Sequence, residues 1–120
     1  MAYCVVLITA PDEEEADRLA SLLVGGRLAA CVNQVPGLKS TYRWKGEVRT
    51  AREVLLVAKT LKTRVKDLIR SVKKNHSYGV PEVLALPVKQ GSRDYLEWIT
   101  ESLKLPSAGT PPADQPKRRS

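Results

Sequence analysis

Residues 3–26 read YCVVLITAPDEEEADRLASLLVGG, and this stretch joins two different hydrophobic patterns. The β-branched, apolar run Tyr3–Thr9 predicts a central strand that is buried on both faces. Asp12 predicts a helix N-cap, and Glu15, three residues later, forms with it a pair typical of a capping box. Apolar residues then recur at helical spacing up to Gly25-Gly26, where the helix is expected to end. The chain therefore begins with a strand followed by a helix.

The same patterns predict five further elements. They are a strand over 28–44 that is interrupted at 36–37 and ends in a turn at 44–47, a strand over 48–60, a helix over 65–75, a strand over 83–88, and a helix with Ser92 as its N-cap. This order predicts an α+β fold, a ferredoxin-like βαββαβ sandwich with an extra C-terminal helix. Right-handed crossovers place the strands in the order 4-1-3-2. Pro36 and Pro87 then fall on the two edge strands, where proline is tolerated.

Length and charge limit the class of protein. We expect one domain over residues 1–104, followed by a disordered basic tail over 105–120 that is rich in proline and serine. The net charge of +7 arises from residues 60–76 and from that tail. The alternatives are a solvated helix face or a patch for nucleic acid or membrane, and the first is favoured, so neither partner is expected. No apolar run approaches the roughly 20 residues of a membrane-spanning helix.

Several activities occur on this topology, so the function has to be argued from sites. An RNA-recognition motif uses aromatic residues on its central strands, but here those strands are aliphatic and the chain contains no phenylalanine. The loop Thr9–Asp12 lacks both the Cys-x-x-Cys pair of a metallochaperone and the cationic phosphate cradle of an acylphosphatase-like enzyme. Cys4 and Cys31 lie on strands that a third strand separates. We expect them to be small buried residues in a reducing compartment.

His76 is the only histidine, and it follows the second predicted helix. One interpretation is a helix C-terminal residue whose ring meets free carbonyl groups, and the other is a metal ligand. Glu82 is the nearest carboxylate in sequence, so the two residues supply two ligands rather than a complete site. No Ser-His-Asp or Cys-His arrangement is evident.

Several motifs, in order along residues 3–103, resemble the CutA family of divalent-cation tolerance proteins. They are Thr9-Ala10-Pro11-Asp12-Glu13, Arg27-Leu28-Ala29-Ala30-Cys31-Val32-Asn33, Val35-Pro36-Gly37, Tyr42-Arg43-Trp44-Lys45-Gly46, His76-Ser77-Tyr78-Gly79-Val80-Pro81-Glu82, Leu84-Ala85-Leu86-Pro87-Val88, Gly91 and Asp94-Tyr95-Leu96-Glu97-Trp98. The resemblance implies a cytoplasmic homotrimer of ferredoxin-like subunits, similar in architecture to the PII signalling proteins. It also implies a link to copper and other divalent cations.

The chain departs from the family at its metal ligands. Some members carry a cysteine where this chain has Ile8, and two adjacent histidines where it has Asn75 and His76; Ser77 stands where proline is usual. The implied metal site therefore carries over only at His76. We expect a divalent metal, Cu²⁺, to be only weakly bound there.

The leading hypothesis is a trimeric, non-enzymatic binding or signalling-like protein. The long second strand and the two exposed sheet edges also favour a closed ring of subunits. The alternative is a small enzyme that acts at the intersubunit clefts, with Lys59, Tyr78 and Glu82 as polar candidates. Tyr42 and Trp44 either line the same clefts, where a small ligand or a metal would bind, or pack in the trimer interface. No feature of the sequence demands turnover.

Overall fold

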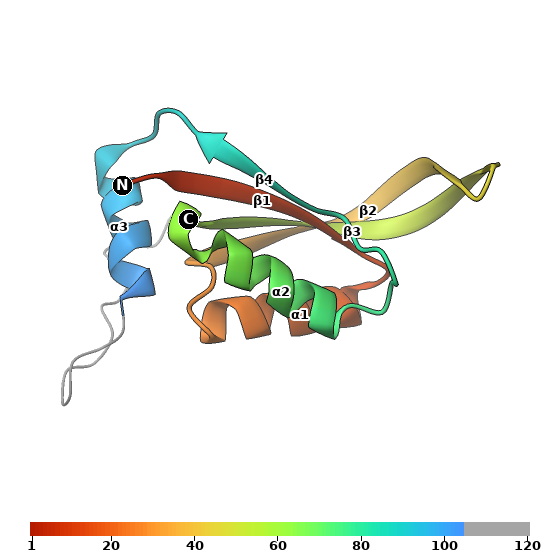
Figure 1. Cartoon of the computed structure of the whole chain (residues 1–120), viewed down its shortest axis with the longest axis horizontal. Coiled ribbons are helices and arrows are strands. Elements are labelled where there is room, and N and C mark those ends of the chain that lie inside the picture. Colours follow the sequence, from red (N-terminus) through yellow and green to blue (C-terminus); the bar gives the residue numbers. More distant parts are fainter. Residues whose placement is uncertain (105–120) are drawn as a thin grey trace.

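The computed structural model describes residues 1–104, and the predicted basic tail at 105–120 lies outside that range. The elements follow the predicted order: β1 (Tyr3–Ala10), α1 (Glu13–Gly25), β2 (Cys31–Trp44), β3 (Glu47–Leu61), a short 3-10 turn (Lys62–Arg64), α2 (Val65–Asn75), β4 (Val83–Val88) and α3 (Arg93–Leu103). The turn between β2 and β3 has positive φ angles at Lys45 and Gly46. This β2–β3 hairpin projects well beyond the rest of the molecule (Figure 1).

The sheet has four strands in the order β2-β3-β1-β4, and all neighbouring pairs are antiparallel. This order confirms the predicted ferredoxin-like topology. Pro36 and Pro87 lie on the edge strands β2 and β4, as the sequence indicated. Cys4 pairs with Thr60 of β3, whereas Cys31 pairs with the neighbouring Lys59 from the other side of β3. The two free thiols are therefore two strands apart.

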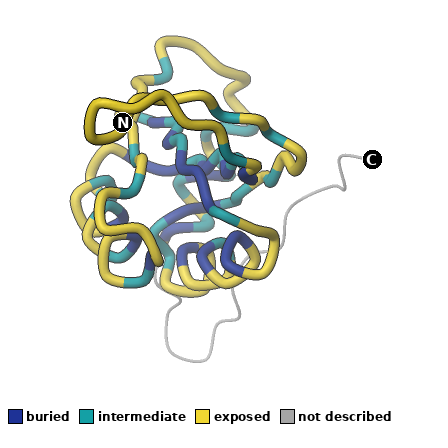
Figure 2. The backbone as a smooth tube through the Cα atoms, turned by 90° about the vertical axis from the view of Figure 1, so that its right-hand side faces the viewer, coloured by how far each residue is buried: buried dark blue, intermediate teal, exposed yellow. Residues whose placement is uncertain are grey.

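Helices α1 and α2 cover one face of the sheet, and the main core lies between them and the strands (Figures 1 and 2). Val6 and Ile8 of β1 are fully buried in that core. Val5 and Leu7 point to the opposite face and are only partly buried. The prediction of a β1 strand buried on both faces is therefore wrong for the single chain, because the helices cover only one side of the sheet.

Helix α3 closes one end of the sheet through a second, smaller core. Ile99 and Leu103 pack with Ala30 and Leu61. Ser92 makes no side-chain capping hydrogen bond; its carbonyl oxygen accepts from the backbone N–H of Leu96 at 3.0 Å. The predicted Ser92 side-chain cap is therefore wrong.

The predicted cap of α1 is correct in one half only. The Oδ1 of Asp12 accepts from the backbone N–H of Glu15 at 2.8 Å, as an N-cap should. The Glu15 carboxylate does not return to the Asp12 backbone, and instead accepts from the N–H and the hydroxyl of Ser77, both at 3.0 Å. A tertiary contact thus replaces the expected capping box.

Candidate functional site

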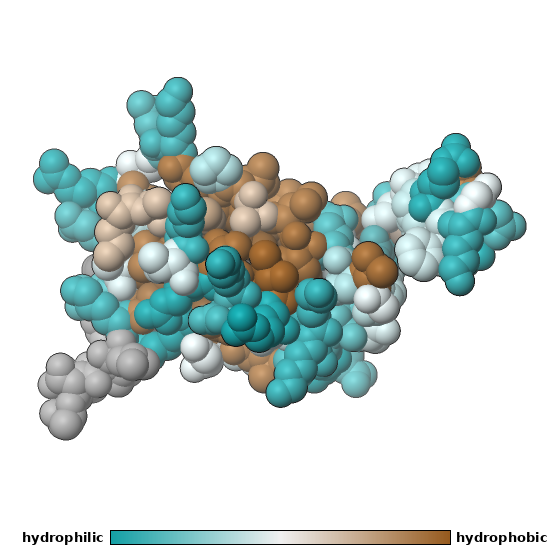
Figure 3. All heavy atoms as spheres, viewed as in Figure 1, coloured by the Kyte–Doolittle hydropathy of each residue, from teal (hydrophilic) through white to brown (hydrophobic). Residues whose placement is uncertain are grey.

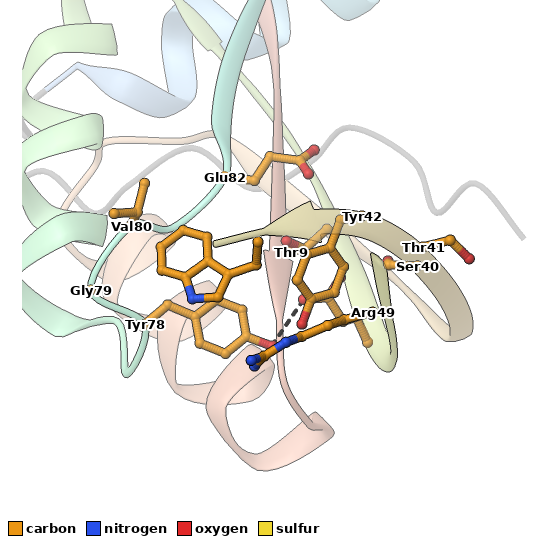
Figure 4. A pocket seen from close by; sticks show the side chains of 11 residues that line it. Thr9, Ser40, Thr41, Tyr42, Arg49, Tyr78, Gly79, Val80 and Glu82 are labelled. Atoms are coloured by element: carbon orange, nitrogen blue, oxygen red, sulfur yellow. Dashed lines mark hydrogen bonds between the residues drawn. The ribbon is translucent and has the colours of Figure 1, made fainter. Parts of the chain in front are cut away.

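A cavity of about 720 Å³ lies between the β2–β3 hairpin and the loop that leads into β4 (Figure 4). Its walls are aromatic, hydroxyl and charged side chains together with the loop backbone: Thr9, Ser40, Thr41, Tyr42, Trp44, Arg49, Glu53, Tyr78, Gly79, Val80 and Glu82. The side chains of Tyr42, Arg49 and Tyr78 converge on one part of it in Figure 4. A cavity of this size is typical of small-molecule sites.

A β-bulge in β2 determines which side chains face the cavity. Val35 pairs with Leu55, but the next pairing, of Leu38 with Glu53, leaves one extra residue on β2. Beyond it, Tyr42 lies opposite Arg49, and Trp44 lies opposite Glu47. Without the extra residue, Thr41 and Arg43 would take these places, because a one-residue slip reverses the faces of a strand. The bulge at 36–37 thus brings the aromatic rings to the cavity.

His76 anchors the loop that forms the other wall. Its side chain is fully buried. The Nε2 lies 2.7 Å from the carbonyl oxygen of Thr9, and the Nδ1 accepts from the backbone N–H of Tyr78 at 3.0 Å. With Nδ1 as the acceptor from Tyr78, Nε2 is the ring nitrogen that donates to Thr9. The Glu15 carboxylate lies 3.3 Å from Nδ1 and also holds Ser77, so the loop is attached to both β1 and α1.

Tyr78 and Glu53 connect the loop to β3. The Tyr78 hydroxyl donates to Oε2 of Glu53 at 2.9 Å, the contact drawn as a dashed line in Figure 4. Burial raises the pKa of Tyr78 to about 12, and the hydrogen bond to Glu53 and that carboxylate's negative charge add to the rise. The phenol is therefore protonated at neutral pH. It serves as a hydrogen-bond donor and not as a base.

The structure brings together most of the predicted cleft residues. Tyr42, Trp44, Tyr78 and Glu82 line the one cavity, and Glu82 is exposed at its rim. Lys59 lies six residues beyond Glu53 on β3, roughly 20 Å along the strand. Its ammonium group hydrogen-bonds Asn33 and the carbonyl oxygen of Val57, away from the cavity lining. Lys59 is therefore not part of this site in the single chain.

Sequence reasoning missed Glu53 and Arg49. Glu53 directly precedes the apolar run Val54–Ala58, so a carboxylate at the start of that run was a usable signal. Arg49 is one of several charged residues in the hairpin, and nothing in the sequence distinguishes it. The sequence does not mark the hydroxyl residues of the lining either, which are Thr9, Ser40 and Thr41. Serine and threonine are common in strands without any functional role.

The predicted metal ligand does not sit in a metal-binding arrangement. Both ring nitrogens of His76 have protein partners. Ile8 is buried in the core, and the Asn75 side chain donates to the carbonyl oxygen of Ser71 at 2.8 Å. Within residues 1–104, no group of three or more His, Cys, Asp or Glu residues could hold a metal ion. These residues do not fit a closed metal centre in one chain, and His76 would have to release Thr9 or Tyr78 to bind one.

The comparisons with known proteins agree with the fold. Residues 4–102 match the family described as CutA1 divalent ion tolerance protein. A divalent-cation tolerance protein CutA from Thermus thermophilus is 53% identical over 98 residues, which cover 82% of this chain and 95% of the relative. A chloroplastic protein CutA 1 from Oryza sativa is 48% identical over 100 residues, which cover 83% of this chain and 56% of the relative.

Solved structures give the same result. The Thermus thermophilus divalent cation tolerance protein superposes with a TM-score of 0.80 at 52% identity, covering 81% of this chain and 94% of that one. CutA1 from Oryza sativa superposes with a TM-score of 0.83 at 47% identity, covering 85% and 94%. Fold and cavity together define a ferredoxin-like protein with a polar, aromatic-walled site between a long hairpin and the loop before β4. The chain belongs to the CutA1 family of divalent ion tolerance proteins.

None of the helices within residues 1–104 has the length and the apolar composition that a membrane span needs.

Proposed function

We propose that this divalent-cation tolerance protein acts as a homotrimeric, non-enzymatic binding protein, with the cavity as its ligand site at a subunit boundary. The observation that carries the proposal is the uncovered face and edges of the sheet. The edge strands β2 and β4 have no partner on their outer sides within residues 1–104. Unpaired strand edges readily pair with another chain, and a closed ring removes them.

The uncovered face of the sheet is apolar. The registers place Leu7, Val57 and Leu84 side by side on the face opposite the helices. Leu84 is 57% exposed and Leu86, two residues on, is 47% exposed. In Figure 3 apolar side chains gather over the middle of the molecule, whereas the projecting hairpin is mostly hydrophilic. A contiguous exposed apolar surface of this kind is typical of an interface between protein chains.

The cavity lies beside both edges. One wall belongs to the edge strand β2, and the other belongs to the loop that enters the edge strand β4. A neighbouring subunit that pairs with either edge would therefore border the cavity. This position supports the proposal that the site is completed by assembly.

The protonation of Tyr78 and the hydrogen bonds of His76 favour binding over catalytic turnover. The Tyr78 phenol stays protonated because its pKa is raised to about 12. His76 is buried with both nitrogens engaged, so it does not face the cavity as a general base.

For the metal link, we propose weak Cu²⁺ binding by the single chain, in the micromolar range or weaker, since one or two ligands make a poor site. The involvement of His76 stays a prediction. We also propose a cytoplasmic location, because two free cysteines suit a reducing compartment. The name of the rice relative says chloroplastic, and a structure from Archaeoglobus fulgidus is titled periplasmic.

Light scattering at low micromolar concentration tests the assembly. We expect a mass about three times the 13.3 kDa of the chain. A stable monomer under these conditions would contradict the proposal.

A further inference from the structure

The charges around the cavity indicate which ligands it can accept. Its lining contains one cation, Arg49, and two carboxylates, Glu53 and Glu82. The guanidinium of Arg49 already lies 3.0 Å from the carboxylate of Glu47, its neighbour on the same face of the hairpin. That pair is neutral overall. The remaining charge of the site is therefore negative.

Glu53 is the decisive group because it is nearly buried. Only 9% of its surface is exposed, and its hydrogen-bond donor, the Tyr78 hydroxyl, brings no positive charge to it. In residues 1–104 neither Glu53 nor Glu82 takes part in an ion pair. A carboxylate so removed from water needs a positive partner to offset its loss of solvation. The side of Glu53 that faces the cavity is where such a partner would fit.

Aromatic rings line the same cavity as this carboxylate, and the Tyr78 hydroxyl is hydrogen-bonded to it. Tyr42, Trp44 and Tyr78 all line the cavity, and each is between one third and one half exposed. The face of an aromatic ring attracts cations, and alkylated ammonium groups are bound in aromatic cages for this reason. The chain's own Lys45 already illustrates the attraction, with its ammonium 6.0 Å from the centroid of the Trp44 ring.

We propose that the cavity binds a small organic cation, one with an alkylated ammonium group that meets the Glu53 carboxylate and the faces of the aromatic rings. This inference rests on the proposed binding function and names the chemical class of its ligand. A Ca²⁺ ion fits the lining poorly, since Ca²⁺ takes six to eight oxygen ligands and only two of the lining residues, Glu53 and Glu82, are carboxylates. An anionic ligand would have to approach two carboxylates with only the paired Arg49 to attract it.

Three probes of similar size separate charge from shape: choline, its neutral isostere 3,3-dimethyl-1-butanol, and the zwitterion glycine betaine. Binding is followed by chemical-shift changes of the Trp44 indole N–H in the assembled protein, with Trp98 as the internal reference. We expect choline to bind at least about tenfold more tightly than the neutral alcohol. This ratio is the gain in affinity expected when a cation contacts aromatic rings and a carboxylate away from water. Equal affinities for the two would overturn the proposal. Tighter binding of glycine betaine than of choline would also overturn the proposal, because it would show that Arg49 binds the carboxylate of the ligand.

Glu53→Gln tests the carboxylate, because the amide oxygen can still accept from Tyr78. We expect it to weaken choline binding about tenfold, whereas Glu97→Gln on the exposed side of α3 leaves the affinity unchanged. Circular dichroism and light scattering on each variant confirm that fold and assembly are intact. Unchanged choline affinity in Glu53→Gln, or no choline binding by an intact trimer, refutes the ligand assignment alone. A monomeric wild type refutes the proposed function instead.

Discussion

At the scale of single residues, a side chain that looked available for chemistry is used for structure. His76 was the natural metal candidate, being the only histidine. In the folded chain its ring ties Thr9 of β1 to Tyr78 of the cavity loop. The same loop is held by Glu15, the residue expected to cap its own helix. Both residues position the cavity wall from behind and do not line it.

Replacing His76 should therefore cost stability. His76→Ala leaves the Thr9 carbonyl and the Tyr78 N–H without their buried partner and opens a small void, so we expect a loss of about 2–4 kcal/mol in the free energy of unfolding. Urea denaturation measures it. Asn75→Ala, which loses one local side-chain bond to Ser71, is the matched control and should cost less than about 1 kcal/mol. Equal effects of the two substitutions would show that His76 does not anchor the loop.

Copper titration of the same variant tests the metal prediction. We expect Cu²⁺ affinity in the micromolar range or weaker, with loss at acidic pH if the imidazole is a ligand. Nanomolar affinity that survives in His76→Ala would exclude His76 as the ligand and point to the cysteines, Cys4 and Cys31. Calorimetry of the wild type and the variant makes the comparison.

The raised pKa of Tyr78 gives a pH dependence with a definite sign. The folded chain holds the phenolic proton more tightly than the unfolded chain does, to a pKa of about 12 against the ordinary 10.0. Its contribution to stability is therefore complete below about pH 10 and is lost as the pH rises through 12. Phenolate absorbance of the wild type minus that of Tyr78→Phe should show this late titration. Glu53→Gln should lower the midpoint, and an unchanged midpoint would assign the whole effect to burial.

At the scale of elements, one extra residue in β2 decides what the hairpin presents. The bulge between Val35 and Leu38 places Tyr42 and Trp44 on the cavity face. Gly37 within it has a φ of +77°, a conformation that residues with a Cβ adopt at a cost. The interruption at Pro36-Gly37 was visible in the sequence. Its consequence for the faces of the strand was not, because that depends on the partner register.

Gly37→Ala should disturb this element without a steric clash. No atom lies within 4 Å of the added Cβ, so the expected cost is the backbone strain of about 1 kcal/mol. The cross-peaks of Tyr42 and Trp44 should shift as the bulge relaxes. Gly25→Ala is the control, since Gly25 ends a helix with open space around it, and should be neutral or slightly stabilising. If both variants have the same stability, the backbone conformation at position 37 does not require glycine.

At the scale of the whole molecule, the uncovered sheet face and its edges are the features that the helices leave unsatisfied. Leu84 and Leu86 on β4 are exposed apolar side chains of that face. In a monomer they would face water. We interpret them as contacts of the proposed trimer.

Leu86→Lys should break the assembly. Burying an unpaired charge in the interface costs several kcal/mol, which is comparable to the free energy of association. We therefore expect light scattering to find monomers at micromolar concentration. Leu22→Lys on α1, where the leucine is 41% exposed beside Leu86 at 47%, is the matched control and should leave the trimer intact. Retention of the trimer in Leu86→Lys would locate the interface elsewhere.

The sequence alone determined the element order, the strand order and the edge positions of Pro36 and Pro87, because hydrophobic periodicity, turn chemistry and crossover handedness are local or nearly local properties. It also indicated four residues that share the cavity: Tyr42, Trp44, Tyr78 and Glu82. Only the tertiary structure excluded Lys59 from that cavity, brought Glu53 and Arg49 into it, and buried His76 between Thr9 and Tyr78. These outcomes depend on which strand register and which loop face each other across the fold. A side chain's type says what it can bind, but its partners and its burial decide what it does, and both are set by residues far away in the chain.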